Sequence, residues 1–154
     1  ESAKKTLLSL EEKFSHNASP LFNRELYANL GHAAIRLNEL DEHVIYREKS
    51  LDGAIKVGNV QQMGIAGYNL GRAYQMKNRF DEALTTFEQS ASNAKKASDP
   101  ETRISATMRV IEVTFLKGDK QEARKMFKSI DFKQSTLSEG LKVRYQDLNN
   151  LVSF

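Results

Sequence analysis

The polar residues best suited to binding chemistry recur at a fixed spacing along the chain. Asn29, Asn69 and Arg109 follow one another at intervals of 40 residues, and Arg72 lies three residues after Asn69. An amide side chain both donates and accepts hydrogen bonds, so a row of amides can hold an extended peptide backbone. A guanidinium can bind a carboxylate through two parallel hydrogen bonds. This spacing favours recognition of a peptide, and the competing interpretation is an ordinary solvated helix face.

Residues for catalysis or metal binding are not arranged in recognisable patterns. The chain has no cysteine, which excludes disulfides, thiolate metal sites and cysteine nucleophiles. The three histidines, His16, His32 and His43, show no paired ligand spacing. The glycine-containing segment 64–71 lies inside a helical pattern, so it indicates close helix packing rather than a phosphate loop. We therefore expect no enzyme activity, no cofactor and no bound metal.

Composition and charge are those of one globular domain spanning residues 1–154. Hydrophobic residues make up 40% of the chain and charged residues 28%. The formal net charge of +3 is too small to argue for nucleic acid or a membrane surface. No apolar run approaches the roughly 18 residues that a membrane span needs. We expect no nucleic-acid partner and no insertion into a membrane, and the cytoplasm is the default expectation for location.

A repeat of 40 residues runs through the chain. The segment 29–59 falls on the segment 69–99 without a gap, and 11 of the 31 positions are identical. A further shift of 40 residues places Phe87 on Phe127. One period kept along the chain is the signature of stacked repeats rather than a chance match.

Each period indicates two helices. Apolar residues recur at helical spacing on both sides of Asn78, whose equivalents are Asn38 and Gly118. Asn and Gly tolerate the left-handed conformation that ends a helix. Asp99 and Pro100 mark a helix start. No strand is predicted, and the predicted helices are residues 2–15, 21–37, 41–57, 61–77, 81–97, 100–117, 120–130 and 137–153.

The repeat register leaves both ends of the chain incomplete. The chain opens in the second helix of one repeat and closes in the first helix of another. It also begins with Glu1 rather than Met and shows no signal-peptide pattern. We therefore expect a fragment of a longer array.

The repeat motifs resemble those of the tetratricopeptide repeat family. The best copy consists of Leu70, Gly71, Tyr74, Ala83 and Phe87. The period is longer than the usual length of about 34 residues, which is similar to a long-helix subgroup found in animal polarity scaffolds and in some bacterial regulators. The resemblance implies an all-α solenoid, a right-handed superhelix of stacked antiparallel hairpins with about eight helices.

The first copy departs from the family pattern. His43 and Arg47 occupy the positions that carry Ala83 and Phe87 in the best copy. A histidine and an arginine replace the small residue and the aromatic residue of the hairpin interface. The pattern therefore leaves the packing of the first hairpin open.

The resemblance places a concave binding face on the first helix of each repeat. It implies a scaffold that binds a protein or peptide partner, either an extended peptide, which could be acidic, or a partner helix. One alternative is a sensory or regulatory domain of a larger signalling protein, whose helix packing shifts on ligand binding. Another is an architectural or self-association unit that uses the unpaired terminal helices. The expected groove residues are Asn29, His32, Arg36, Tyr68, Asn69, Arg72, Gln75, Met108, Arg109 and Glu112.

Overall fold

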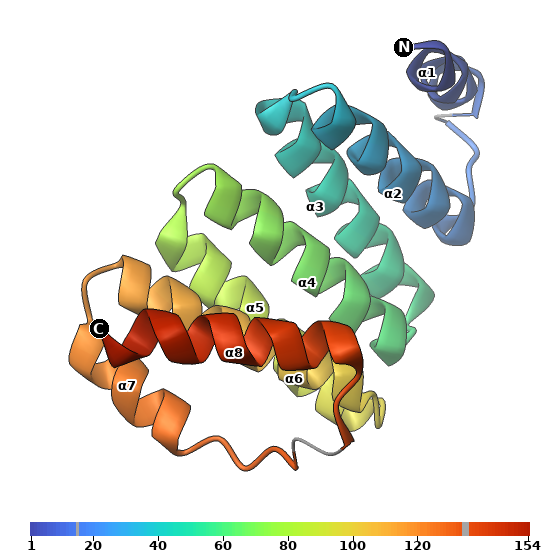
Figure 1. Cartoon of the computed structure of the whole chain (residues 1–154). Coiled ribbons are helices and arrows are strands. Elements are labelled where there is room, and N and C mark those ends of the chain that lie inside the picture. The colour runs from blue at the N-terminus through green and yellow to red at the C-terminus, as the bar shows by residue number, and fades with distance from the viewer. Residues whose placement is uncertain (15, 134–135) are drawn as a thin grey trace.

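The structure is a computed structural model that describes residues 1–14, 16–133 and 136–154 (Figure 1). Across these residues it is all α-helical, with eight helices and no strand. Every predicted helix is present, and the described boundaries lie within two residues of the prediction; the predicted end of the first helix, residue 15, lies outside the described residues. The helices are α1 Ser2–Phe14, α2 Pro20–Arg36, α3 Leu40–Val57, α4 Val60–Met76, α5 Phe80–Lys96, α6 Pro100–Leu116, α7 Lys120–Lys128 and α8 Glu139–Ser153.

The predicted turn residues do end helices. Asn38, Asn78 and Gly118 have φ values of 59°, 57° and 104°, in the left-handed region. Ser98 follows α5 with φ 56°, although serine lacks the preference of glycine and asparagine for the left-handed conformation. Helices α2, α4 and α6 thus each end where the 40-residue pattern places a turn.

Two helix starts have the expected side-chain caps. The Ser19 hydroxyl accepts a hydrogen bond from the Phe22 amide at 3.2 Å, and the Asp99 carboxylate accepts one from the Thr102 amide at 3.1 Å. In both helices proline occupies the first turn, where a missing N–H costs nothing. These caps begin α2 and α6 at the positions that the sequence indicates.

The helices pack in chain order as antiparallel neighbours, as expected of stacked hairpins (Figure 1). Helix α2 pairs with α3, α4 with α5, and α6 with α7, while α3 packs on α4 and α5 on α6. Helix α8 packs against both α6 and α7. An ion pair recurs with the repeat: Lys77 contacts Asp41 at 2.7 Å, and the equivalent Lys117 contacts Asp81.

A glycine–aromatic contact sets the spacing of the α4–α5 hairpin. Phe87 is fully buried and packs on Gly71, where a Cβ atom would lie 2.6 Å from Phe87 Cε1. Ala83 is also fully buried beside it, whereas Tyr74 is half-buried and its hydroxyl donates to Glu48 at 2.7 Å. Ala83 and Phe87, the small and aromatic residues of the best repeat copy, are thus core residues, and Tyr74 lies at the edge of the core.

In the α2–α3 hairpin the same place is taken by a charged group. Arg47 packs on Gly31, where a Cβ atom would lie 2.9 Å from Arg47 Nε and 3.1 Å from Cζ. His43 is buried one turn earlier, and its Nδ1 lies 2.8 Å from the Gly31 carbonyl oxygen. The flat guanidinium thus fills the position that the phenyl ring of Phe87 fills one repeat later.

Candidate functional site

The first helices of the hairpins lie in one layer, which we call the inner face and define as the surface of α2, α4, α6 and α8. Helix α6 packs against both α4 and α8. Arg144 of α8 donates a hydrogen bond to the Tyr68 hydroxyl of α4 at 2.8 Å, across 76 positions of sequence. His32 of α2 and Asn69 of α4 line one small cavity. All ten predicted groove residues come from α2, α4 and α6.

The predicted residues on α2 face an open cavity. Asn29, His32 and Arg36 are exposed, and with Leu7 of α1 they line a cavity of about 720 Å³ between α1 and α2. The Asn29 amide donates to the Glu25 carbonyl oxygen at 2.9 Å, so part of its hydrogen-bonding capacity is used within its own helix. The Arg36 guanidinium and the remaining polar groups of Asn29 are accessible to a ligand, whereas His32 Nδ1 already contacts Arg47.

The predicted residues on α4 are less exposed. Tyr68, Asn69 and Gln75 are half-buried, while Arg72 is exposed. The Gln75 Oε1 atom is buried and makes no hydrogen bond within the described residues. Asn69 and Arg72 are one turn apart, as predicted, but they differ in accessibility.

On α6 the predicted residues are engaged with the rest of the chain. Met108 is only 1% exposed and belongs to a core cluster that includes Leu141 and Leu148 of α8. Arg109 donates to Glu112 at 2.7 Å, so its carboxylate partner is already present within the chain. Burial lowers the pKa of Arg109, but the neighbouring Tyr68 hydroxyl and Glu112 carboxylate outweigh burial and raise it. These three residues are therefore less available to a ligand than those on α2 and α4.

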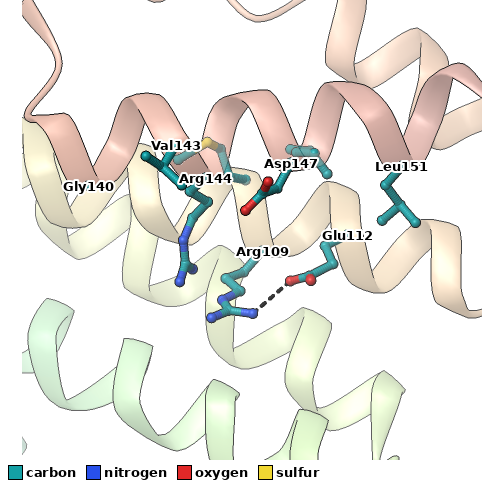
Figure 2. A pocket seen from close by; sticks show the side chains of 9 residues that line it. Arg109, Glu112, Gly140, Val143, Arg144, Asp147 and Leu151 are labelled. Atoms are coloured by element: carbon teal, nitrogen blue, oxygen red, sulfur yellow. Dashed lines mark hydrogen bonds and ion pairs between the residues drawn. The ribbon is translucent and has the colours of Figure 1, made fainter.

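A cavity of about 420 Å³ separates α6 from α8 (Figure 2). Arg109 and Glu112 line one wall, and Val143, Arg144 and Asp147 line the other. The sequence prediction left the α8 residues out, although the repeat register identifies α8 as a first helix, which should contribute to the same face. That register was the signal that could have found Arg144 and Asp147.

A smaller cavity of about 170 Å³ lies between α2, α3 and α4. Arg47 is 5% exposed and reaches it from α3, a second helix, from which the family pattern predicts no groove residue. Its Nη2 lies 3.2 Å from His32 Nδ1 and its Nη1 donates to the Ala28 carbonyl oxygen at 3.4 Å, while Nε has no partner within the described residues. The other lining residues are Arg24, Glu25, Ser50, Gln62, Ile65, Ala66 and Asn69.

The half of the inner face nearest the N-terminus carries uncompensated positive charge. Among the described residues, no carboxylate forms an ion pair with Arg36, Arg47 or Arg72. Burial, reinforced by the charge of Arg72, lowers the pKa of Arg47 to about 10. Burial and then Arg47, Arg36 and Arg72 lower the pKa of His32, which favours its neutral form. These cations repel one another, and the arrangement favours an anionic ligand.

The described residues contain neither a cluster suited to a metal ion nor a helix suited to a membrane span. No group of three or more histidine, aspartate or glutamate side chains there is placed to hold a metal ion. None of the described helices is both long enough and apolar enough to cross a membrane.

Comparison with known proteins adds no assignment. No protein-family model matches the chain, and no curated protein matches it. The tetratricopeptide resemblance therefore stays a prediction from the repeat motifs.

Proposed function

We propose that this chain is a protein-interaction module that binds an acidic peptide or partner helix along the inner face. The observation that carries the proposal is the pair of exposed arginines on successive first helices, Arg36 on α2 and Arg72 on α4, which form no ion pair within the described residues. A groove wall of one charge sign attracts a partner of the opposite sign and sets its orientation.

The amides beside these arginines support a peptide ligand. Asn69 lies one turn before Arg72, and Asn29 is its equivalent one repeat earlier. Each amide can bond a peptide N–H and C=O, while the arginines supply charge-assisted bonds to acidic side chains. A stacked-hairpin fold holds these groups at regular intervals, which suits a ligand with its own regular repeat. The proposed activity is therefore binding rather than catalysis.

The test measures binding of labelled peptides of equal length and acidic, neutral or basic composition by fluorescence anisotropy. We expect the acidic peptides to bind best and their affinity to fall as salt is raised, because groove-wall charges are partly screened. Arg72→Ala should weaken binding by about 1.5–3 kcal/mol, as expected for loss of a hydrogen bond to a charged group. Asn69→Ala should weaken it less.

The matched control is Lys95→Ala, which removes an exposed cation from α5, a second helix. It changes the net charge by the same amount as Arg72→Ala but leaves the inner face intact. Equal binding by wild type and all three variants would contradict the proposal. Sedimentation velocity on the same samples would then show whether self-association, the architectural alternative, occurs.

A further inference from the structure

Arg47 is a buried cation whose hydrogen-bonding capacity is mostly unused. A guanidinium has five N–H donors, and Arg47 makes two hydrogen bonds, of 3.2 and 3.4 Å, to His32 and Ala28. It is 5% exposed and forms no ion pair within the described residues. Buried arginines are normally paired because removing an unpaired charge from water costs several kcal/mol. The missing anion must therefore come from outside the described residues if the charge is to be compensated.

The cavity beside Arg47 has the size and the lining of a small anion site. Its volume of about 170 Å³ is several times the roughly 30 Å³ that one water molecule occupies in the liquid. Besides Arg47, the side chains of Gln62 and Asn69 line it and can donate hydrogen bonds. The single acid in the lining, Glu25, is already paired with Arg24. Arg47, Gln62 and Asn69 therefore have no carboxylate partner of their own within the described residues.

The charge surrounding the cavity favours a doubly charged anion over a singly charged one. Two arginines, Arg24 and Arg47, line it, and the Nε atoms of both are buried with no hydrogen-bond partner within the described residues. Burial and the charge of Arg72 both lower the pKa of Arg47, which is the direction expected for a cation in a positively charged surrounding. A carboxylate carries one negative charge and two acceptor oxygens, whereas a phosphoryl group carries about two negative charges and three acceptor oxygens and can accept from both guanidinium groups.

We propose that the cavity between α2, α3 and α4 binds a phosphoryl group, with Arg47 as the buried anchor and Arg24, Gln62 and Asn69 around it. The phosphoryl group is either free phosphate or part of a phosphorylated segment of a partner. This site does not depend on the peptide-binding function, because free phosphate alone can test it. The repeat marks the anchor: Arg47 takes the position that Phe87 holds in the next hairpin.

The first experiment measures the melting temperature of the protein against the concentration of phosphate, acetate or chloride at constant ionic strength. A ligand that binds only the folded state stabilises it by RT ln(1 + c/Kd), where c is the free ligand concentration, so above Kd the melting temperature keeps rising with the logarithm of the ligand concentration. We expect such a logarithmic rise with phosphate and none with acetate or chloride. An equal rise with acetate would replace the proposal with a carboxylate site, and no rise with any anion would overturn it.

Two variants locate the effect. Arg47→Phe installs the residue of the equivalent position and should abolish the phosphate-dependent rise. Asn69→Asp places a carboxylate in the wall of the cavity, so it should weaken phosphate binding at least about tenfold. Lys95→Ala is the charge-matched control and should respond like wild type. A phosphate response that persists in both cavity variants would show nonspecific anion binding and overturn the proposal.

NMR spectroscopy of the wild-type protein tests the site even if the variants do not fold. In a two-dimensional ¹H–¹⁵N spectrum of the wild-type protein, phosphate should shift the side-chain resonance of Arg47 at a concentration that matches its thermal effect. Unchanged arginine resonances would contradict the proposal without any mutation. Peptides that carry phosphoserine or serine at one position then identify the source: tighter binding of phosphoserine than of free phosphate indicates a partner, and equal binding indicates the free anion.

Discussion

Arg47 packs against Gly31 so closely that a Cβ atom at position 31 would lie 2.9 Å from Arg47 Nε. One repeat later, Gly71 and Phe87 make the same contact, with the corresponding distance at 2.6 Å. The two hairpins therefore share one backbone arrangement and differ in the chemistry of a single buried group. In one hairpin that group is an aromatic ring, and in the other it is an unpaired charge.

Arg47→Phe should stabilise the protein, because the ring fits over glycine in this fold and the buried charge is removed. We expect a gain on the order of 1–4 kcal/mol, the range seen when buried charged groups are replaced by apolar residues of similar volume. Urea unfolding at neutral pH measures it as an increased midpoint. The reverse exchange, Phe87→Arg, should destabilise, and a lowered midpoint for Arg47→Phe would show that the two hairpins are not equivalent.

Gly71→Ala should destabilise the α4–α5 hairpin. The added Cβ atom would lie 2.6 Å from Phe87, whose ring is fully buried and has no room to withdraw. Overpacking of this kind costs about 1–3 kcal/mol. The control is Gly140→Ala in α8, where nothing lies within 4 Å of the added atom and where alanine should instead help by roughly 0.5–1 kcal/mol. Equal melting temperatures for the two variants would contradict the proposed close contact.

The helices were predictable because their signals are local. Asn38, Asn78 and Gly118 carry their conformational preference in their own side chains, and Asp99 caps the helix that follows it. Ser98 adopts the same left-handed conformation without such a preference, in a turn where the Asp99 amide donates to the Ala94 carbonyl oxygen at 2.8 Å. The helices were therefore predictable from local chemistry, whereas the conformation of Ser98 was not.

The candidate site was less predictable, because it depends on which side chains meet across repeats. The spacing of Arg109 and Glu112 is visible in the sequence, but the spacing does not reveal that their ion pair lies in the wall of a cavity closed on its other side by α8. Met108, a predicted groove residue, is 1% exposed in a core cluster with residues of α8 and also lines the cavity between α6 and α8. Arg47 stood out as a departure from the repeat, yet its lack of an acidic partner follows only from the tertiary arrangement.

The hydrogen bond between Arg144 and Tyr68 should couple α8 to α4. The bond is 2.8 Å long and partly buried, and a hydrogen bond to a charged group in such a setting contributes on the order of 1 kcal/mol. A double-mutant cycle with Arg144→Met and Tyr68→Phe, read out by urea unfolding, isolates this coupling energy. If the two single-mutant effects add exactly, this bond does not couple α8 to α4, and α8 is held by its contacts with α6 and α7, among them the hydrogen bond from Arg124 Nε to the Val152 carbonyl oxygen at 2.7 Å.

Stability should decrease as the pH falls below about 6.5 because of His43. This residue is 3% exposed, and burial lowers its pKa below the ordinary value of 6.5, with Arg47 and Arg72 acting in the same direction and the bond to the Gly31 carbonyl opposing them. Below pH 6.5 the histidine takes up a proton in the unfolded chain but stays neutral in the folded protein. The unfolded state then binds more protons, so the free energy of unfolding decreases as the pH is lowered. Well above pH 6.5 the imidazole is neutral in both states, so it does not change the free energy of unfolding with pH.

The pH dependence of His43 can be separated from that of its neighbour. Burial and the surrounding arginines also lower the pKa of His32, so it acts with the same sign, although its exposure to solvent reduces the effect. Urea unfolding of the wild type at a series of pH values from 8 to 5.5 should show a loss of up to about 1.4 kcal/mol per pH unit for each proton taken up on unfolding. His43→Asn, whose amide can still donate to the Gly31 carbonyl, should flatten most of this slope, and His32→Asn should flatten less of it. A slope that is unchanged in His43→Asn would show that another group controls the acid side of the stability profile.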